Sequence, residues 1–240
     1  MSHRRIWFAA VAALAVLPAI SHAQVTLNYQ YFKVRNSAVN PDFKRGIDGG
    51  IVTGIVQAAL GPDGLPVYTG LTGHPSLPVT QVNGANEIQW WTPGADILAD
   101  GTGTITGPLT FNSGFFPTGE SSNANWFRTA IFTGSVDMAS GGTLSFNLGS
   151  DDDAWLFIDG MLVGDDGGIK GAASIPFTTT SLSAGTHNLA LFFADRHEVE
   201  SALTFDPHFA VTATPEPGSI GLLATGLLGL GAAFRRKRAR

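Results

Sequence analysis

The sequence contains no cysteine among its 240 residues, so no disulfide can cross-link the chain. Charged residues are also few, at 14%, whereas a typical soluble domain has about 25%. Disordered chains combine low hydrophobicity with high net charge, so this composition argues against that class. A chain of this length can bury a real core. Outside the reducing cytoplasm, its stability would come from that core or from a bound metal.

Positive charge is especially scarce between residues 24 and 214. This stretch has 18 Asp+Glu and 7 Lys+Arg, which gives a net charge of 7 − 18 = −11. Because Lys and Arg contacts with phosphate drive nucleic-acid binding, we expect no nucleic-acid partner. An acidic body is consistent with cation binding, and equally with an acidic surface that is only solvated.

Glycine is abundant, with 30 residues, and it separates short segments in which apolar and polar residues alternate. Alternation with period two indicates strands, and Gly-containing turns at this spacing favour an all-β fold, an antiparallel β-sandwich or barrel. Residues 51–60 are expected to form one short helix that ends at Gly61-Pro62. No repeat or charged linker divides the body, so one domain is predicted over residues 24–213. The clearest strand segments are 25–32, 126–132, 143–148, 188–193 and 202–213.

An acidic hairpin is predicted between Ser150 and Gly168. Asp159-Gly160 lies between two apolar runs, and this is the strongest short hairpin signal that a sequence offers. Carboxylates then gather at the end of the hairpin opposite its tight turn. We expect any ligand of this protein to bind there.

The metal candidates are the carboxylates of this hairpin, Asp151, Asp152, Asp153 and Asp165. Ca²⁺ takes six to eight oxygen ligands, and neighbouring Asp residues can supply several of them. The spacing is not that of an EF-hand. The alternative is that one Asp caps a turn through backbone N–H groups while the others are solvated.

A second polar cluster, Asp195-Arg196-His197-Glu198, directly follows an apolar strand. Loops at strand ends commonly bind ligands, so Arg196 and His197 are candidate ligand-binding residues beside Asp151 and Asp152. The alternative is an ion pair between Arg196 and an Asp of the hairpin that locks two loops together. A hydrolase would need a nucleophile beside a base, and no nucleophile motif is present.

Trp90-Trp91 is a further candidate. Neighbouring side chains on an extended chain point to opposite faces, so one indole can be buried while the other is exposed. An exposed Trp91 would suit stacking against a sugar. The other interpretation is that the indole anchors the core.

Both ends of the chain have the composition of targeting segments. Residues 1–23 have basic, apolar and small-residue parts in the order of a secretory signal peptide, with cleavage between Ala23 and Gln24. Residues 214–240 contain Pro215-Glu216-Pro217, a short apolar stretch and an Arg-rich end. This stretch predicts a marginal membrane helix whose basic end stays in the cytoplasm.

The C-terminal pattern resembles the PEP-CTERM sorting signal of Gram-negative bacteria that make extracellular polysaccharide. The resemblance implies that an exosortase in the inner membrane recognises Pro215, Glu216 and Pro217 and cuts nearby. The protein would then be anchored transiently before it reaches the cell surface or extracellular matrix. A simple permanent anchor is the alternative.

The body resembles the fibro-slime domain, which is related to the lectin-like β fold first described in anthrax protective antigen. The resemblance rests on the segments 50–68, 115–117, 125–127, 150–160, 165–168 and 191–201. Related adhesin lectins hold Ca²⁺ with two consecutive Asp residues joined by a cis peptide, and this pair falls on Asp151 and Asp152. Those adhesins also use an Asn-bearing loop, and the sequence does not identify its counterpart.

These observations predict an exported, non-enzymatic envelope or matrix protein. Kinship implies a Ca²⁺-dependent carbohydrate site with extracellular polysaccharide as the partner. Two alternatives stay open, namely a structural matrix protein in which Ca²⁺ only pins the loops, and a glycan-active hydrolase.

Overall fold

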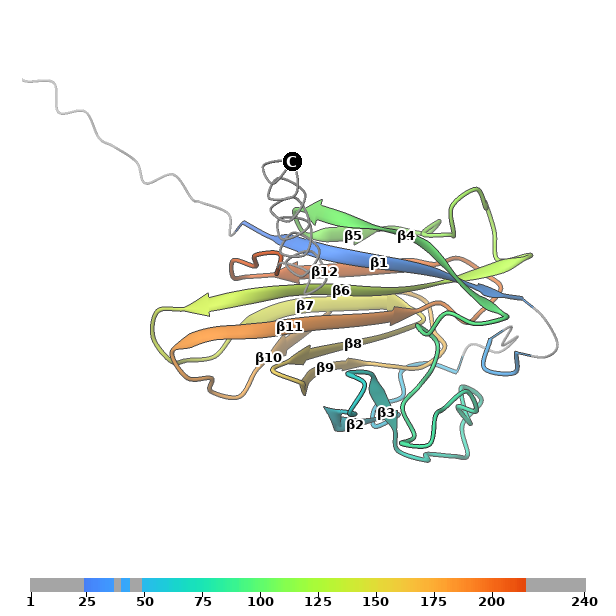
Figure 1. Cartoon of the computed structure of the whole chain (residues 1–240), viewed down its shortest axis with the longest axis horizontal. Helices are drawn as coiled ribbons and strands as arrows, with labels where there is room; N and C mark the ends of the chain where they lie inside the picture. The colour runs from blue at the N-terminus through green and yellow to red at the C-terminus, as the bar shows by residue number, and fades with distance from the viewer. Residues whose placement is uncertain (1–23, 37–39, 44–48, 215–240) are drawn as a thin grey trace, which may run out of the picture.

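A computed structural model describes residues 24–36, 40–43 and 49–214, and these residues form two antiparallel β-sheets (Figure 1). The all-β prediction is therefore confirmed. The expected signal helix and the apolar helix after Thr214 lie outside the described residues. Within the described residues, no helix has the length and apolar character needed to cross a membrane.

The larger sheet has eight strands in the order β3-β2-β9-β8-β11-β6-β1-β4. Apolar strands form its centre, where β11 pairs with β6 on one side and with β8 on the other. Its strands are β1 (Thr26–Arg35), β2 (Val56–Leu60), β3 (Pro66–Tyr68), β4 (Ile97–Thr106), β6 (Trp126–Met138), β8 (Asp153–Ile158), β9 (Met161–Asp166) and β11 (Gly185–Ala194).

The smaller sheet has four strands in the order β10-β7-β12-β5. These are β5 (Leu109–Phe111), β7 (Ser145–Asp151), β10 (Ile175–Thr178) and β12 (Ala202–Pro207). The alternating residues Phe146 and Leu148 of β7 are fully buried, as their period predicts. They belong to a core between the two sheets that also contains Phe132, Leu191 and Phe205.

A second core lies on the other face of the larger sheet. There the segments before β4 cover the sheet with an aromatic cluster in which Trp90, Trp91 and Trp155 contact one another. Phe43 packs against Trp90 and Phe127 in the same cluster. The large sheet is therefore buried on both faces along much of its length.

One local prediction was wrong. Residues 51–60 form turns and then β2, not a helix, because Gly54 has a φ of 79° and the following residues pair with β3 and β9. The ten-residue strand β4 is also absent from the segments that alternation predicts. β4 is hard to detect because three of its residues lie in the Gly-Thr-Gly run, which lacks apolar alternation.

The two ends of the described body lie side by side. The Val211 N–H donates to Gln24 O at 2.9 Å, and the Thr26 N–H donates to Val211 O at 2.7 Å. The Asn28 side-chain amide also donates to the Thr214 carbonyl. Residues 24 and 214 therefore leave the sandwich at the same end.

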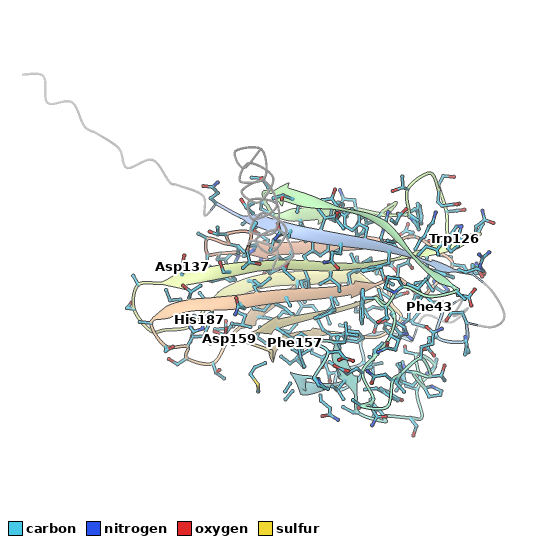
Figure 2. The ribbon with its side chains drawn as sticks, in the orientation of Figure 1. Phe43, Trp126, Asp137, Phe157, Asp159 and His187 are labelled. Carbon is cyan, nitrogen blue, oxygen red and sulfur yellow. The ribbon has the colours of Figure 1, made fainter. Side chains whose placement is uncertain are left out.

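The hairpin at the turn of β8 and β9 is confirmed. Ile158 pairs with Met161, and Asp159 and Gly160 take φ values of 50° and 74°, the left-handed region that a tight two-residue turn requires. The Asp159 carboxylate reaches across to β11, where one oxygen contacts His187 Nδ1 at 2.6 Å and the other accepts the Asn188 N–H. Figure 2 shows the His187 and Asp159 side chains beside each other at this end.

We expect His187→Ala to lower the melting temperature by about 2–4 °C at pH 5.5 and by less at pH 9. The hydrogen bond to Asp159 raises the pKa of His187, so the stabilisation is complete below the unfolded pKa and is lost as pH rises through the folded one. Burial raises the pKa of Asp159, but the hydrogen bonds from His187 and Asn188 lower it below its usual value. The contribution of the Asp159 carboxylate to stability is therefore lost only in acid. Thermal melts across pH check this; an equal loss at both pH values would contradict it, and exposed His208→Ala is the control.

Candidate functional site

The candidate site lies where β7 passes directly into β8. β7 ends at Asp151, β8 begins at Asp153, and the ends of β11 and β12 lie opposite, with Ala194 paired to Asp153 and Ala202 paired to Asp151. The Asp151–Asp152 peptide bond is cis, as the resemblance to adhesin lectins predicts. Asp151, Asp152 and Asp153 are at most 4% exposed, so three consecutive carboxyl groups are buried at this junction.

Asp153 forms a buried ion pair with Arg196. Arg196 Nε lies 2.6 Å from Asp153 Oδ2, and both side chains are fully buried. The other Asp153 oxygen accepts the Gly168 N–H at 2.6 Å. Arg196 Nη1 donates to the carbonyls of Ser76 and Asp42, and its guanidinium lies over the Trp90 ring. The predicted ion pair that locks loops together is confirmed, and it occupies both Arg196 and Asp153.

Asp152 connects two loops through backbone N–H groups. Its Oδ1 accepts from Lys170 N at 3.0 Å and its Oδ2 accepts from Arg196 N at 2.6 Å. The Lys170 ammonium is buried below, where it donates to the carbonyls of Ser150 and Asp152 and pairs with Asp166. A carboxylate oxygen has a second lone pair, so both Asp152 oxygens can still accept from another ligand.

Asp165 belongs to a different structural unit. Its Oδ1 accepts the Trp155 indole N–H at 3.0 Å, and its Oδ2 accepts the Gly54 N–H at 2.8 Å. Burial raises the pKa of Asp165, and these hydrogen bonds oppose the rise. Its position fixes the loop before β2 onto the hairpin.

Asp195 is a fully buried carboxyl group whose two oxygens accept no hydrogen bond of good geometry from the described residues. Ser201 and Asn123 lie close enough to lower its pKa slightly, but the Ser201 hydroxyl is directed to Phe115 O. The Asn123 amide donates to His197 O and Glu200 O, which leaves Asn123 Oδ1 also buried without a donor. Three acceptor oxygens, two on Asp195 and one on Asn123, therefore lack a well-aligned donor, and Asp195 lies close enough to Asp151 and Asp152 for their charges to raise its pKa.

The electrostatics of this group are unfavourable without a cation. Burial, and then the charge of Asp152, raise the pKa of Asp151 to about 8. Burial and the charge of Asp153 raise the pKa of Asp152 to about 6. Burial and the charges of Asp152 and Asp151 raise the pKa of Asp195 well above its usual range. These carboxyls need protons or a bound cation to be neutralised.

The remaining candidates occupy other positions. Trp91 is 3% exposed, and its indole N–H donates to Phe193 O, so it belongs to the second core. His197 is half-buried, and its backbone carbonyl accepts a hydrogen bond from the Asn123 side-chain amide. In the described part of the chain, no group of three or more His, Asp or Glu side chains forms a ready-made metal site. A cation beside Asp151 would therefore also need amide, carbonyl or water oxygens.

Sequence reasoning missed Asp195, Asn123 and Lys170 as members of this cluster. The sequence places Asp195 in the second polar cluster, and nothing in the local pattern marks Asn123 or Lys170 as its neighbours. The apolar β11 directly before Asp195 was the available signal, because that strand pairs with β8 and ends beside it.

Comparison with protein families finds one match, the PEP-CTERM protein-sorting motif, over residues 213–237. The protein psiQ of Dictyostelium discoideum is 27% identical over 238 residues, covering 86% of this chain and 23% of psiQ. The psiB protein of the same organism is 44% identical over 64 residues, covering 25% of this chain and 12% of psiB. The chain spans less than a quarter of the length of either relative.

Solved structures with a similar course of the chain include the PA14 domain of the MpAFP antifreeze protein. It is 12% identical, covers 82% of this chain and 86% of its own, and has a TM-score of 0.40. The epithelial adhesin 9 A domain of Candida glabrata, solved with Galβ1-4GlcNAc, is 12% identical, covers 81% and 91%, and has a TM-score of 0.40. The C-terminal motif indicates export to the cell surface or extracellular space. The chain therefore carries the PEP-CTERM protein-sorting motif at its C-terminal end, joined to an all-β body of two antiparallel sheets.

Proposed function

We propose that the body is a carbohydrate-binding module whose site contains Ca²⁺ at the junction of β7 and β8. One observation carries the proposal: the buried oxygens of Asp195 and Asn123 lack donors next to Asp151 and Asp152. Hard oxygen donors of this kind suit Ca²⁺, and the cation would neutralise carboxyls whose pKa values are raised. Asp151, Asp152, Asp195 and Asn123 would hold the ion, whereas Asp153 and Asp165 fix the surrounding loops.

A cation at this position would leave some coordination positions for water or for a ligand. Vicinal sugar hydroxyls are neutral oxygen donors that can replace such waters. The residues around it supply no substitute for the ion, since Arg196 and Lys170 are buried and already paired. Binding of a glycan would therefore require the metal.

Binding to a glycan array in Ca²⁺ and in chelator tests this function. We expect saturable binding that chelation abolishes and that Asp151→Asn weakens at least about tenfold, equivalent to about 1.4 kcal/mol. Asp137→Asn is the matched control, because this exposed aspartate lies at the far end of β6. Ca²⁺-stabilised protein that binds no glycan would instead support a structural ion.

For the sorting segment we propose that an exosortase cuts the exported precursor near Pro215-Glu216-Pro217. Replacing Glu216 with Ala should abolish cleavage, because the change removes the only charge of the tripeptide. Immunoblots of membrane and culture fractions would show a precursor that accumulates. A control change just before the matched motif, Thr212→Ser, should be processed normally, and normal processing of Glu216→Ala would refute the assignment.

A further inference from the structure

The four edges of the two sheets differ in how they are protected. β3, at one edge of the larger sheet, has three residues and begins with Pro66. Its outer side is covered, because Tyr68 N donates to Asn86 O and Ile88 N donates to Pro66 O, both at 2.8 Å. In the smaller sheet, β10 contains Pro176 and has four residues, and β5 has three residues and follows Pro108. Short edges with proline resist pairing with another chain.

β4, the fourth edge, is neither short nor interrupted by proline, and its one irregularity is a bulge at Asp100, opposite Tyr31 and Phe32 of β1. It runs for ten residues along β1 and contains neither proline nor lysine. Within the described residues its ladder lies on one side only, and Figure 1 shows it at the upper border of the large sheet. Its Thr and Ile residues favour strand pairing. Beyond the bulge, residues 101–106 of this edge present a row of backbone donors and acceptors to another strand.

The charge of β4 is also neutralised. Asp100 is its only charged residue, and this carboxylate lies 2.7 Å from Arg128 Nη1, with both side chains at most 7% exposed. An approaching strand therefore meets no net charge along the edge. This matters because the body as a whole is acidic, and two copies would repel each other at most other surfaces.

We propose that β4 pairs with β4 of a second copy of this chain, antiparallel about a two-fold axis. Identical strands meet most simply in this way, because a two-fold axis makes the same surface serve both partners. The pairing joins the two large sheets into one continuous sheet and covers Leu98, which is 38% exposed. The site near Asp151 lies at the ends of β7, β8 and β11 rather than on β4, so the dimer carries two such sites.

Sedimentation velocity of the protein purified after export tests this, from about 1 to about 100 µM. We expect a reversible dimer, and Thr102→Lys/Thr104→Lys should weaken it at least about tenfold because lysine repels an opposing copy. Thr110→Lys/Thr178→Lys adds the same charge to the two short edges and should leave the dimer intact. All these threonines are exposed, so each variant should fold.

Hydrogen exchange supplies an independent readout. The amides of β4 that point away from β1 should exchange more slowly at high protein concentration, and the Thr102→Lys/Thr104→Lys variant should abolish that dependence. A monomer over the whole range overturns the proposal. So does a dimer that both double variants weaken equally, or β4 protection that appears only when a different envelope protein is added.

Discussion

Arg196→Met should destabilise the protein by about 3–5 kcal/mol, which lowers the melting temperature by about 10 °C. The variant removes a fully buried guanidinium and leaves the Asp153 carboxylate without its ion-pair partner. It also frees the carbonyls of Ser76 and Asp42, through which Arg196 attaches the covering segments to the hairpin. Denaturant unfolding followed by tryptophan fluorescence would measure the loss.

Arg35→Met is the matched control. Arg35 pairs with Asp96 at 3.3 Å, but its side chain is 49% exposed, so water screens the pair and the change should cost at most about 1 kcal/mol. If Arg196→Met does not fold, Asp153→Asn/Arg196→Met should recover part of the stability because the uncompensated charge is gone. Equal losses of stability in the Arg196 and Arg35 variants would contradict a stabilising role for the buried ion pair between Arg196 and Asp153.

Without metal, the protein should lose stability as pH rises from about 4 to about 8. The pKa values of Asp151 and Asp152 are raised in the folded state, to about 8 and about 6. The folded state therefore holds more protons than the unfolded state in this window, and stability falls as those protons leave. We expect a drop of about 5–10 °C in chelator, and saturating Ca²⁺ should remove it, since the ion replaces the protons.

Asp195→Asn gives this prediction a second readout. At pH 8 in chelator the variant should melt higher than the wild type, because it removes a buried negative charge beside two others. In Ca²⁺ it should melt lower, because a ligand is lost. Asp206→Asn, an exposed aspartate, is the control in both conditions. A wild-type melting curve that is the same in Ca²⁺ and in chelator at every pH would refute the ion.

Local chemistry was enough to predict β7 and the hairpin of β8 and β9, but not β2 or β4. Alternation in β7 and the Asp159-Gly160 turn depend on neighbouring residues only, and both are present. Trp91 is not the exposed indole that opposite-facing neighbours would give, and the alternative of a core anchor is confirmed. The two side chains share one core because both residues lie in a turn and not in an extended strand.

The site could be predicted only in part. The sequence identifies the acidic residues, but which of them lack partners depends on contacts that close long loops. Asp153 is neutralised by Arg196, 43 residues later in the chain. Asp195 lacks a well-aligned donor because Asn123 and Ser201 donate to backbone carbonyls instead. The sequence around Asp195 does not predict those partners.

The two ends of the body, at Gln24 and Thr214, lie together at one end of the domain, so its two ends differ in what they carry. β1 begins where Val211 and Thr212 pair with Val25 and Ser135, whereas β11 runs to the opposite end of the large sheet (Figure 1). Asp195 directly follows β11 there, where Ala194 pairs with Asp153. The two ends of the body, at residues 24 and 214, therefore lie at one end of the domain, and the carboxylates lie at the other. If the proposed cleavage near Pro215-Glu216-Pro217 occurs, it therefore acts at the end of the domain opposite these carboxylates and leaves their surroundings unchanged.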